Sequence, residues 1–137
     1  MVNKVVAHFL DKTIRRGYTS DFRPDGQLFH LIVKEGGEEK SVPVRIAALK
    51  AVFFVKELMG KDRSRPVVKR GFADFKDKNL IGKKVKITFN DGETLLGTTL
   101  GYSPKRHGFF FTPIDPESNN ERVFAVTSSV KDITFIE

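Results

Sequence analysis

The sequence contains no cysteine and no tryptophan among its 137 residues. The lack of cysteine excludes a disulfide framework, a thiolate metal site and a cysteine nucleophile. No apolar run approaches the roughly 20 residues that a membrane-spanning helix needs, so we expect no contact with a membrane interior. The N-terminal segment is interrupted early by His8 and Asp11, unlike a signal peptide, and a cytoplasmic location is the resulting expectation.

The composition is that of a folded globular protein, with 39% hydrophobic and 30% charged residues. Thirteen phenylalanines dominate the aromatic set, and rings without a polar tip are expected to fill cores. The net charge is +7, and it is unevenly distributed: residues 3–56 carry ten basic and six acidic side chains, whereas residues 82–137 carry seven of each. A basic surface in the first half favours a polyanionic partner, of which nucleic acid is the most common.

The two halves of the sequence resemble each other at an offset of 80 residues, or 81 near their ends. The offset superimposes turn residues and apolar residues in the same order, which indicates an internal repeat. The matching pairs include Val5 with Val85, Phe9 with Phe89, Asp11 with Asp91, Gly17 with Gly97, Pro24 with Pro104, Phe29 with Phe109, Val52 with Ile133 and Phe54 with Phe135.

Both copies show the period-2 alternation of apolar and polar residues that is typical of half-buried strands. We predict strands at 5–10, 15–21, 28–34, 41–46 and 52–56, and again at 85–89, 94–100, from 109, 122–126 and 131–136. Asp91-Gly92 and Gly36-Gly37 predict tight hairpin turns. Gly97 predicts a bulge or a sharp bend inside its strand.

The predicted fold is therefore all-β: two tandem five-stranded SH3-like (Sm-like) barrels related by an internal repeat, with a short helical turn before each last strand. The predicted domains are residues 1–57 and 82–137, joined by a basic linker at 58–81. Each copy has about 55 residues, near the lower limit for independent folding. We therefore expect the copies to pack together or to share sheet edges.

A short motif in the second copy, Asp91-Gly92 followed by Leu95, Gly97 and Tyr102, resembles the first half of the Sm motif. That resemblance implies a small RNA-binding barrel. The sequence departs from the family at residues 103–109, where the asparagine that helps hold the base is missing. The chain also resembles an uncharacterised bacterial domain of the Lys-Val-Val-x-His-Phe-x-Asp type, a pattern found at residues 4–11, which implies no activity.

Basic residues interleaved with aromatic rings are what a surface for single-stranded nucleic acid needs, because bases stack on rings while phosphates pair with cations. The predicted contact residues are Arg15, Arg16, Tyr18, Arg23, Lys61, Arg63, Arg65, Lys69, Arg70, Lys105 and Arg106. The competing interpretation is structural: the linker is a solvated tether, the rings belong to cores, and the cations protect strand edges from aggregation.

Nothing in the sequence predicts catalysis, a metal site or a cofactor. The three histidines, His8, His30 and His107, are not spaced as metal ligands, and no nucleophile lies beside a base. The leading hypothesis is a non-catalytic binding or adaptor protein for single-stranded RNA or DNA. The alternative is a protein–protein interaction or regulatory signalling module. Cyclic-dinucleotide binding is a weaker option, because Arg65 and Arg70 are one residue too far apart for the Arg-x-x-x-Arg arm of PilZ domains.

Overall fold

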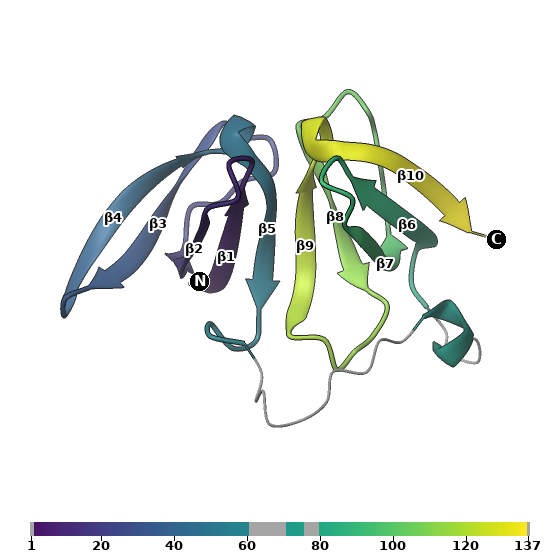
Figure 1. The fold of residues 1–137 in the computed structure, drawn as a ribbon, viewed down its shortest axis with the longest axis horizontal. Coiled ribbons are helices and arrows are strands. Elements are labelled where there is room, and N and C mark those ends of the chain that lie inside the picture. Colours follow the sequence, from purple (N-terminus) through teal and green to yellow (C-terminus); the bar gives the residue numbers. More distant parts are fainter. Residues whose placement is uncertain (1, 61–70, 76–79, 137) are drawn as a thin grey trace.

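A computed structural model describes residues 2–60, 71–75 and 80–136, and these residues form an all-β protein (Figure 1). The N-terminal half contains β1 (Asn3–Phe9), β2 (Ile14–Thr19), β3 (Leu28–Glu35), β4 (Glu38–Arg45) and β5 (Leu49–Val55). The C-terminal half contains β6 (Lys83–Phe89), β7 (Thr94–Thr99), β8 (Gly108–Pro113), β9 (Asn120–Val126) and β10 (Val130–Ile136). The ten predicted strands are therefore confirmed, with their ends displaced by a few residues.

All ten strands belong to one sheet, in the order β10-β6-β7-β8-β9-β5-β1-β2-β3-β4. Within each half the fifth strand lies beside the first, followed by the second, third and fourth. The halves meet where β9 pairs with β5 in antiparallel register, with Phe124 opposite Val52 and Arg122 opposite Phe54. We call this pairing the central joint, and it lies in the middle of the molecule in Figure 1.

The all-β class is confirmed, but the prediction of two closed five-stranded barrels is not. Among the described residues, β4 pairs with β3 alone and β10 pairs with β6 alone, so both are open edges of the sheet. Neither half closes on itself, because the fourth strand of one half pairs with the fifth strand of the other. The expectation that the two copies share sheet edges describes this arrangement correctly.

The central joint is buried on both faces, so each core contains residues from both halves. Val52 and Phe54 of β5 pack with Phe124 of β9 in the core of the N-terminal half. Phe53 of β5 packs with Val123 of β9 in the core of the C-terminal half. Successive strand residues point to opposite faces of a sheet, and a strand buried on both faces reads as a continuous apolar run.

Gly17 and Gly97 occupy the same position in the two halves, and both permit a close approach of the second and third strands. A Cβ atom on Gly17 would lie 2.3 Å from the carbonyl oxygen of Ile32, and one on Gly97 would lie 2.3 Å from that of Thr112. No side chain fits at such a distance from backbone. Gly97, which suggested a bend, and its counterpart Gly17 are therefore both required by this contact.

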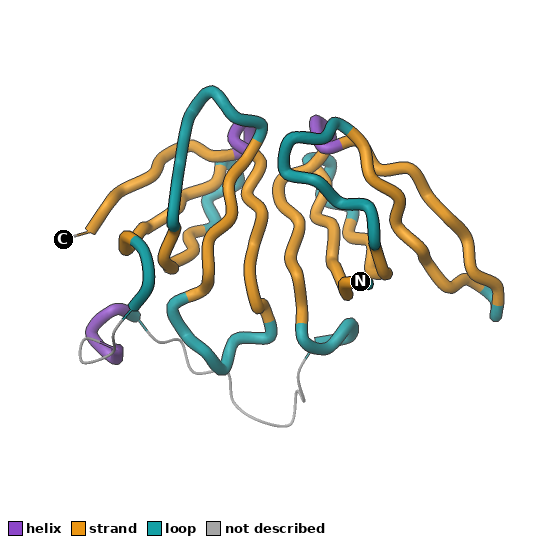
Figure 2. Tube along the Cα trace, turned by 180° about the vertical axis from the view of Figure 1, so that it is seen from behind, coloured by secondary structure: helices purple, strands orange, loops and turns teal. Residues whose placement is uncertain are grey.

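Short 3₁₀ turns precede the last strand of each half, as predicted: η1 (Ile46–Ala48) and η3 (Thr127–Ser129). Both turns lie at the same end of the sheet (Figure 2). A further turn, η2 (Phe72–Phe75), lies inside the predicted linker.

Gly92 has the positive φ that its hairpin demands, and Lys12 adopts a φ of 74° at the same place in the other half.

Candidate binding cleft

One end of the central joint is held by ion pairs from Lys50, near the start of β5, to the β6–β7 hairpin of the other half. The ammonium group of Lys50 lies 2.6 Å from carboxylate oxygens of both Asp91 and Glu93, and its side chain is only 12% exposed. The hydroxyl of Ser129 donates a hydrogen bond to the carbonyl oxygen of Lys50 at 2.7 Å. The opposite end is closed by Asn119, whose side-chain amide exchanges two hydrogen bonds with the backbone of Glu57.

The pKa values at this joint follow from those contacts. Burial acts to lower the pKa of Lys50, but its hydrogen bonds with Asp91 and Glu93 outweigh burial and raise it. The pKa of Asp91 is lowered, first by the hydrogen bond from Lys50 and then by the backbone N–H of Glu93. The pKa of His8 is lowered, chiefly by burial and next by the charge of Lys50. The two halves are therefore fixed relative to each other by a charged network as well as by apolar packing.

The β2–β3 loop of the N-terminal half is fixed by Asp21. Its carboxylate accepts hydrogen bonds from the Thr19 hydroxyl and the His30 backbone N–H, and it lies 2.7 Å from the His30 ring nitrogen Nδ1. Burial acts to raise the pKa of Asp21, but these hydrogen bonds outweigh burial and lower it. The anchored carboxylate fixes the start of the loop that carries Phe22 and Pro24.

Phe22 crosses from this loop to the other half. Its ring makes edge-to-face contacts with Phe54 at 5.4 Å and with Phe110 and Phe124 of the C-terminal half at 6.1 and 5.1 Å between centroids. Such contacts contribute beyond the area that they bury. The ring therefore joins the β2–β3 loop to β8 and β9, and it brings Pro24 to the wall of a cleft.

The β7–β8 loop, residues 100–107, forms the other wall. The Thr99 hydroxyl donates to the carbonyl oxygen of Phe110 at 2.8 Å and so holds the start of the loop against β8. At its end, the Thr127 hydroxyl donates to the carbonyl oxygen of Arg106 at 2.8 Å, and the Thr127 N–H donates to that of His107. Both ends are therefore anchored, while the side chains between them are largely exposed.

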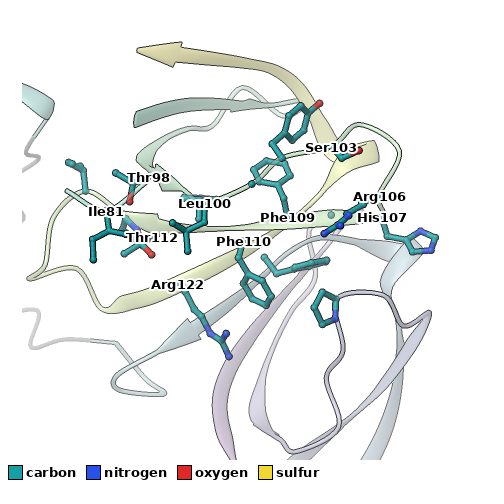
Figure 3. Close-up of a pocket in the computed structure, with 18 of the residues that line it drawn as sticks. Ile81, Thr98, Leu100, Ser103, Arg106, His107, Phe109, Phe110, Thr112 and Arg122 are labelled. Carbon is teal, nitrogen blue, oxygen red and sulfur yellow. The ribbon is translucent and has the colours of Figure 1, made fainter. Parts of the chain in front are cut away.

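The cleft between these walls has a volume of about 1430 Å³ and receives residues from both halves. Figure 3 shows Leu100 and Phe110 reaching it from the end of β7 and from β8, with Arg122 from β9 beside them. The guanidinium of Arg122 lies over the rings of Phe54 and Phe110, at 4.3 and 4.7 Å from their centroids. A typical small-molecule pocket holds about 300 to 1,000 Å³, so this cleft suits an extended ligand.

The cleft is apolar and positively charged. Leu100 and Ile81 on its rim are 85% and 79% exposed, unusually high values for large apolar side chains. Lys105, Arg106 and Arg122 supply cations, whereas Asp25 is the lining carboxylate in the described part of the chain and lies 3.5 Å from Arg23. The arrangement is suited to a ligand that is both apolar and anionic.

The structure brings only part of the predicted nucleic-acid surface together. Lys105 and Arg106 line the cleft, and Arg23 reaches Asp25 on its wall. Arg15 and Arg16 are neighbours on β2 and so point to opposite faces of the sheet, with Tyr18 on the same face as Arg16. The linker cations Lys61, Arg63, Arg65, Lys69 and Arg70 lie outside the described residues.

Sequence reasoning missed Arg122, Phe110 and Leu100. The run Phe109-Phe110-Phe111 contained a usable signal, because strand alternation sends the middle ring to the face opposite the other two. Phe109 and Phe111 indeed belong to the core of the C-terminal half, while Phe110 packs against the other core. No comparable signal linked Arg122 to that ring.

Among residues 2–60, 71–75 and 80–136, no group of three or more His, Asp or Glu side chains could hold a metal ion. No helix within the same residues is long and apolar enough to cross a membrane. No curated protein and no solved structure matches the chain. The match to a family model over residues 1–137, the whole chain, shows that the protein belongs to DUF6982, a family of unknown function.

Proposed function

We propose that this protein is a non-catalytic binding module that holds single-stranded nucleic acid in the cleft between the β2–β3 and β7–β8 loops. The observation that carries the proposal is the stack of Arg122 on Phe54 and Phe110, in a cleft that the exposed cations Lys105 and Arg106 also line. A guanidinium plane that rests on a ring offers its other face to a base, while neighbouring cations pair with phosphates.

The proposal retains the nucleic-acid hypothesis and changes its location. The contact surface becomes the cleft rather than the basic first half, with Lys105, Arg106 and Arg122 as the principal residues. The basic linker at 61–70 is proposed to add sequence-independent phosphate contacts. The same strand order in both halves supports the interpretation of the chain as a tandem repeat derived from an SH3-like or Sm-like unit. Bacterial origin and cyclic-dinucleotide binding stay predictions.

The experiment is a fluorescence anisotropy titration of a labelled 15-nucleotide single strand, as DNA and as RNA, at two salt concentrations. We expect binding that weakens steeply with salt, and a loss of about tenfold or more in affinity for the double variant Arg106→Ala with Arg122→Ala. Lys34→Ala is the control, because it removes an exposed cation on β3 and should change the affinity little. A second variant, Arg63→Ala with Arg65→Ala, measures the linker's share.

A protein ligand is the second candidate, and the exposure of Leu100 and Ile81 favours it. A hydrophobic protein interface depends much less on salt than phosphate binding does. Absence of oligonucleotide binding at low salt would overturn the nucleic-acid proposal and leave the protein ligand. Equal binding by the wild type and the Arg106/Arg122 double variant would place any nucleic-acid site elsewhere.

A further inference from the structure

The pairing of β5 with β9 at the central joint shows what kind of strand can pair with the outer side of the fifth strand of a half. β5 and β10 occupy the same place in the strand order of the two halves. β5 is paired with β9, whereas no strand of the described residues pairs with the outer side of β10. In β5, Val52 and Phe54 are 0% and 3% exposed, and they pack in a core that contains Phe124 of β9. Their counterparts in β10 are Ile133, which is half-buried, and Phe135, which is 47% exposed.

The backbone of β10 is oriented for a further ladder. The Phe110 carbonyl accepts a hydrogen bond from the Thr99 hydroxyl and therefore points toward β7. Phe124, which lies opposite Phe110, consequently directs its N–H and C=O away from β8, toward Val52 of β5. Val52 lies opposite Ala7 of β1, and Ile133 lies opposite Ile87 of β6 in the matching register. Val52 directs its N–H and C=O toward β9. Ile133, the equivalent residue, therefore directs its N–H and C=O toward the open edge of β10.

We propose that the β10 edge binds an extended segment of another protein as an eleventh, antiparallel strand. The segment's chemistry follows from β9: a cation opposite Phe135, as Arg122 lies over Phe54, and an aromatic or aliphatic side chain two residues later opposite Ile133, as Phe124 lies opposite Val52. Main-chain hydrogen bonds supply affinity in strand addition, and alternate side chains supply specificity. This proposal is independent of the nucleic-acid cleft.

The open edge strand β4 of a second copy does not fit that description. The strand that corresponds to β9 is β4, where Pro43 replaces Phe124 and Ser41 replaces Arg122. His30, opposite Pro43, donates its N–H to Asp21 on the β2 side, so the nitrogen of Pro43 faces the open edge and has no proton to donate. Proline on an edge strand is a known device against edge-to-edge pairing. β4 of a second copy is therefore not the occupant. Pairing of β10 with β10 of a second copy, which would set Lys131 opposite Phe135, is distinguished by the dependence on protein concentration described below.

The test uses a synthetic peptide with the sequence of residues 117–128, ESNNERVFAVTS, which contains β9. It is added to the full-length, isotope-labelled protein, and amide shifts and hydrogen exchange are followed by NMR. We expect concentration-dependent shifts and slowed exchange at the outward-facing amides of β10, centred on Ile133 and Phe135. The matched peptide with Phe124→Pro, which copies the proline of β4, is expected not to bind.

The protein variant Phe135→Ala should weaken peptide binding about tenfold, because it removes the ring that faces the peptide's arginine. Leu28→Ala is the matched control, since Leu28 is 44% exposed on β3, far along the sheet from β10. Absence of shifts in β10, or shifts confined to β5, would overturn the proposal. So would slowed exchange in β10 that grows with protein concentration alone, because the edge would then pair with a second copy.

Discussion

The two halves share one strand order, and three of the equivalent positions at which they differ show how their surroundings differ. The N-terminal half has Asp21, His30 and Pro43 where the C-terminal half has Gly101, Phe110 and Phe124. Phe110 and Phe124 meet Phe22 and Phe54 across the central joint, whereas His30 and Pro43 lie on β3 and β4, at the open end of the sheet. These three positions therefore differ according to what covers them. The two phenylalanines lie where the other half packs against them, whereas the aspartate and the histidine face water.

The largest expected effect on stability comes from a substitution at the central joint, compared with one at the equivalent position of the other half. Phe124→Ala should lower the free energy of unfolding by about 4 kcal/mol, because it removes a fully buried ring that packs between the halves. Pro43→Ala, at the equivalent position, should change it by less than about 1 kcal/mol, because β4 lies at the edge. Urea denaturation followed by circular dichroism measures both. Similar losses for the two variants would contradict the proposed role of the joint.

The next effect concerns charge. Lys50→Met should cost about 1 to 2 kcal/mol, between the values for exposed and buried ion pairs, because Lys50 is nearly buried and faces two carboxylates. Lys131→Met is the control, since Lys131 is the exposed counterpart of Lys50 and makes no ion pair among the described residues.

The same ion pair has a predicted pH dependence. The folded protein lowers the pKa of Asp91 below its ordinary value of 3.8. A carboxyl group of this kind stabilises the fold above its unfolded pKa, and that stabilisation is lost as the pH falls through the lower folded pKa. We therefore expect the stability difference between the wild type and Lys50→Met to shrink below about pH 4. A constant difference from pH 7 to pH 2 would show that Lys50 stabilises by packing alone.

The smallest expected effect sharpens the comparison of the two hairpins. Lys12 adopts a φ of 74° where Gly92 adopts 93°. The left-handed conformation is unfavourable for a residue with a Cβ atom, although glycine has a greater entropic cost of folding. Lys12→Gly should therefore stabilise the protein by up to about 1 kcal/mol, and Gly92→Ala should destabilise it by about as much. Thermal unfolding of both variants, in parallel, checks the opposite signs.

Local chemistry made the strands and turns predictable. Alternating residues such as Val85, Ile87 and Phe89 predicted a half-buried strand, and the hairpin glycines predicted their turns. The pairing of β5 with β9 was harder to predict from the sequence, because it depends on a match between segments far apart in the chain. The apolar run from Val52 to Val55 is nevertheless typical of a strand buried on both faces, and it points to a neighbour beyond the half that contains it.

The cleft could be predicted only in part, for the same reason. Lys105 and Arg106 were found because they are adjacent to each other and near Tyr102 in the sequence. Arg122 joins Phe54 only through the ladder between β9 and β5, so its role depends on the joint. A binding site built at the meeting of two similar halves cannot be read from either half alone.

The central joint also has a consequence for how the chain folds. The Ser129 hydroxyl bonds to the Lys50 carbonyl across 79 residues of sequence, and β9 completes the core that β5 begins. Neither half can finish burying its apolar residues until the other has formed, so unfolding should be one cooperative transition rather than two. Contacts between residues so distant also require a large loop to close first, which predicts slow folding for a chain of this length. An isolated half, expressed alone, should therefore be partly unfolded and prone to aggregation through its uncovered strand.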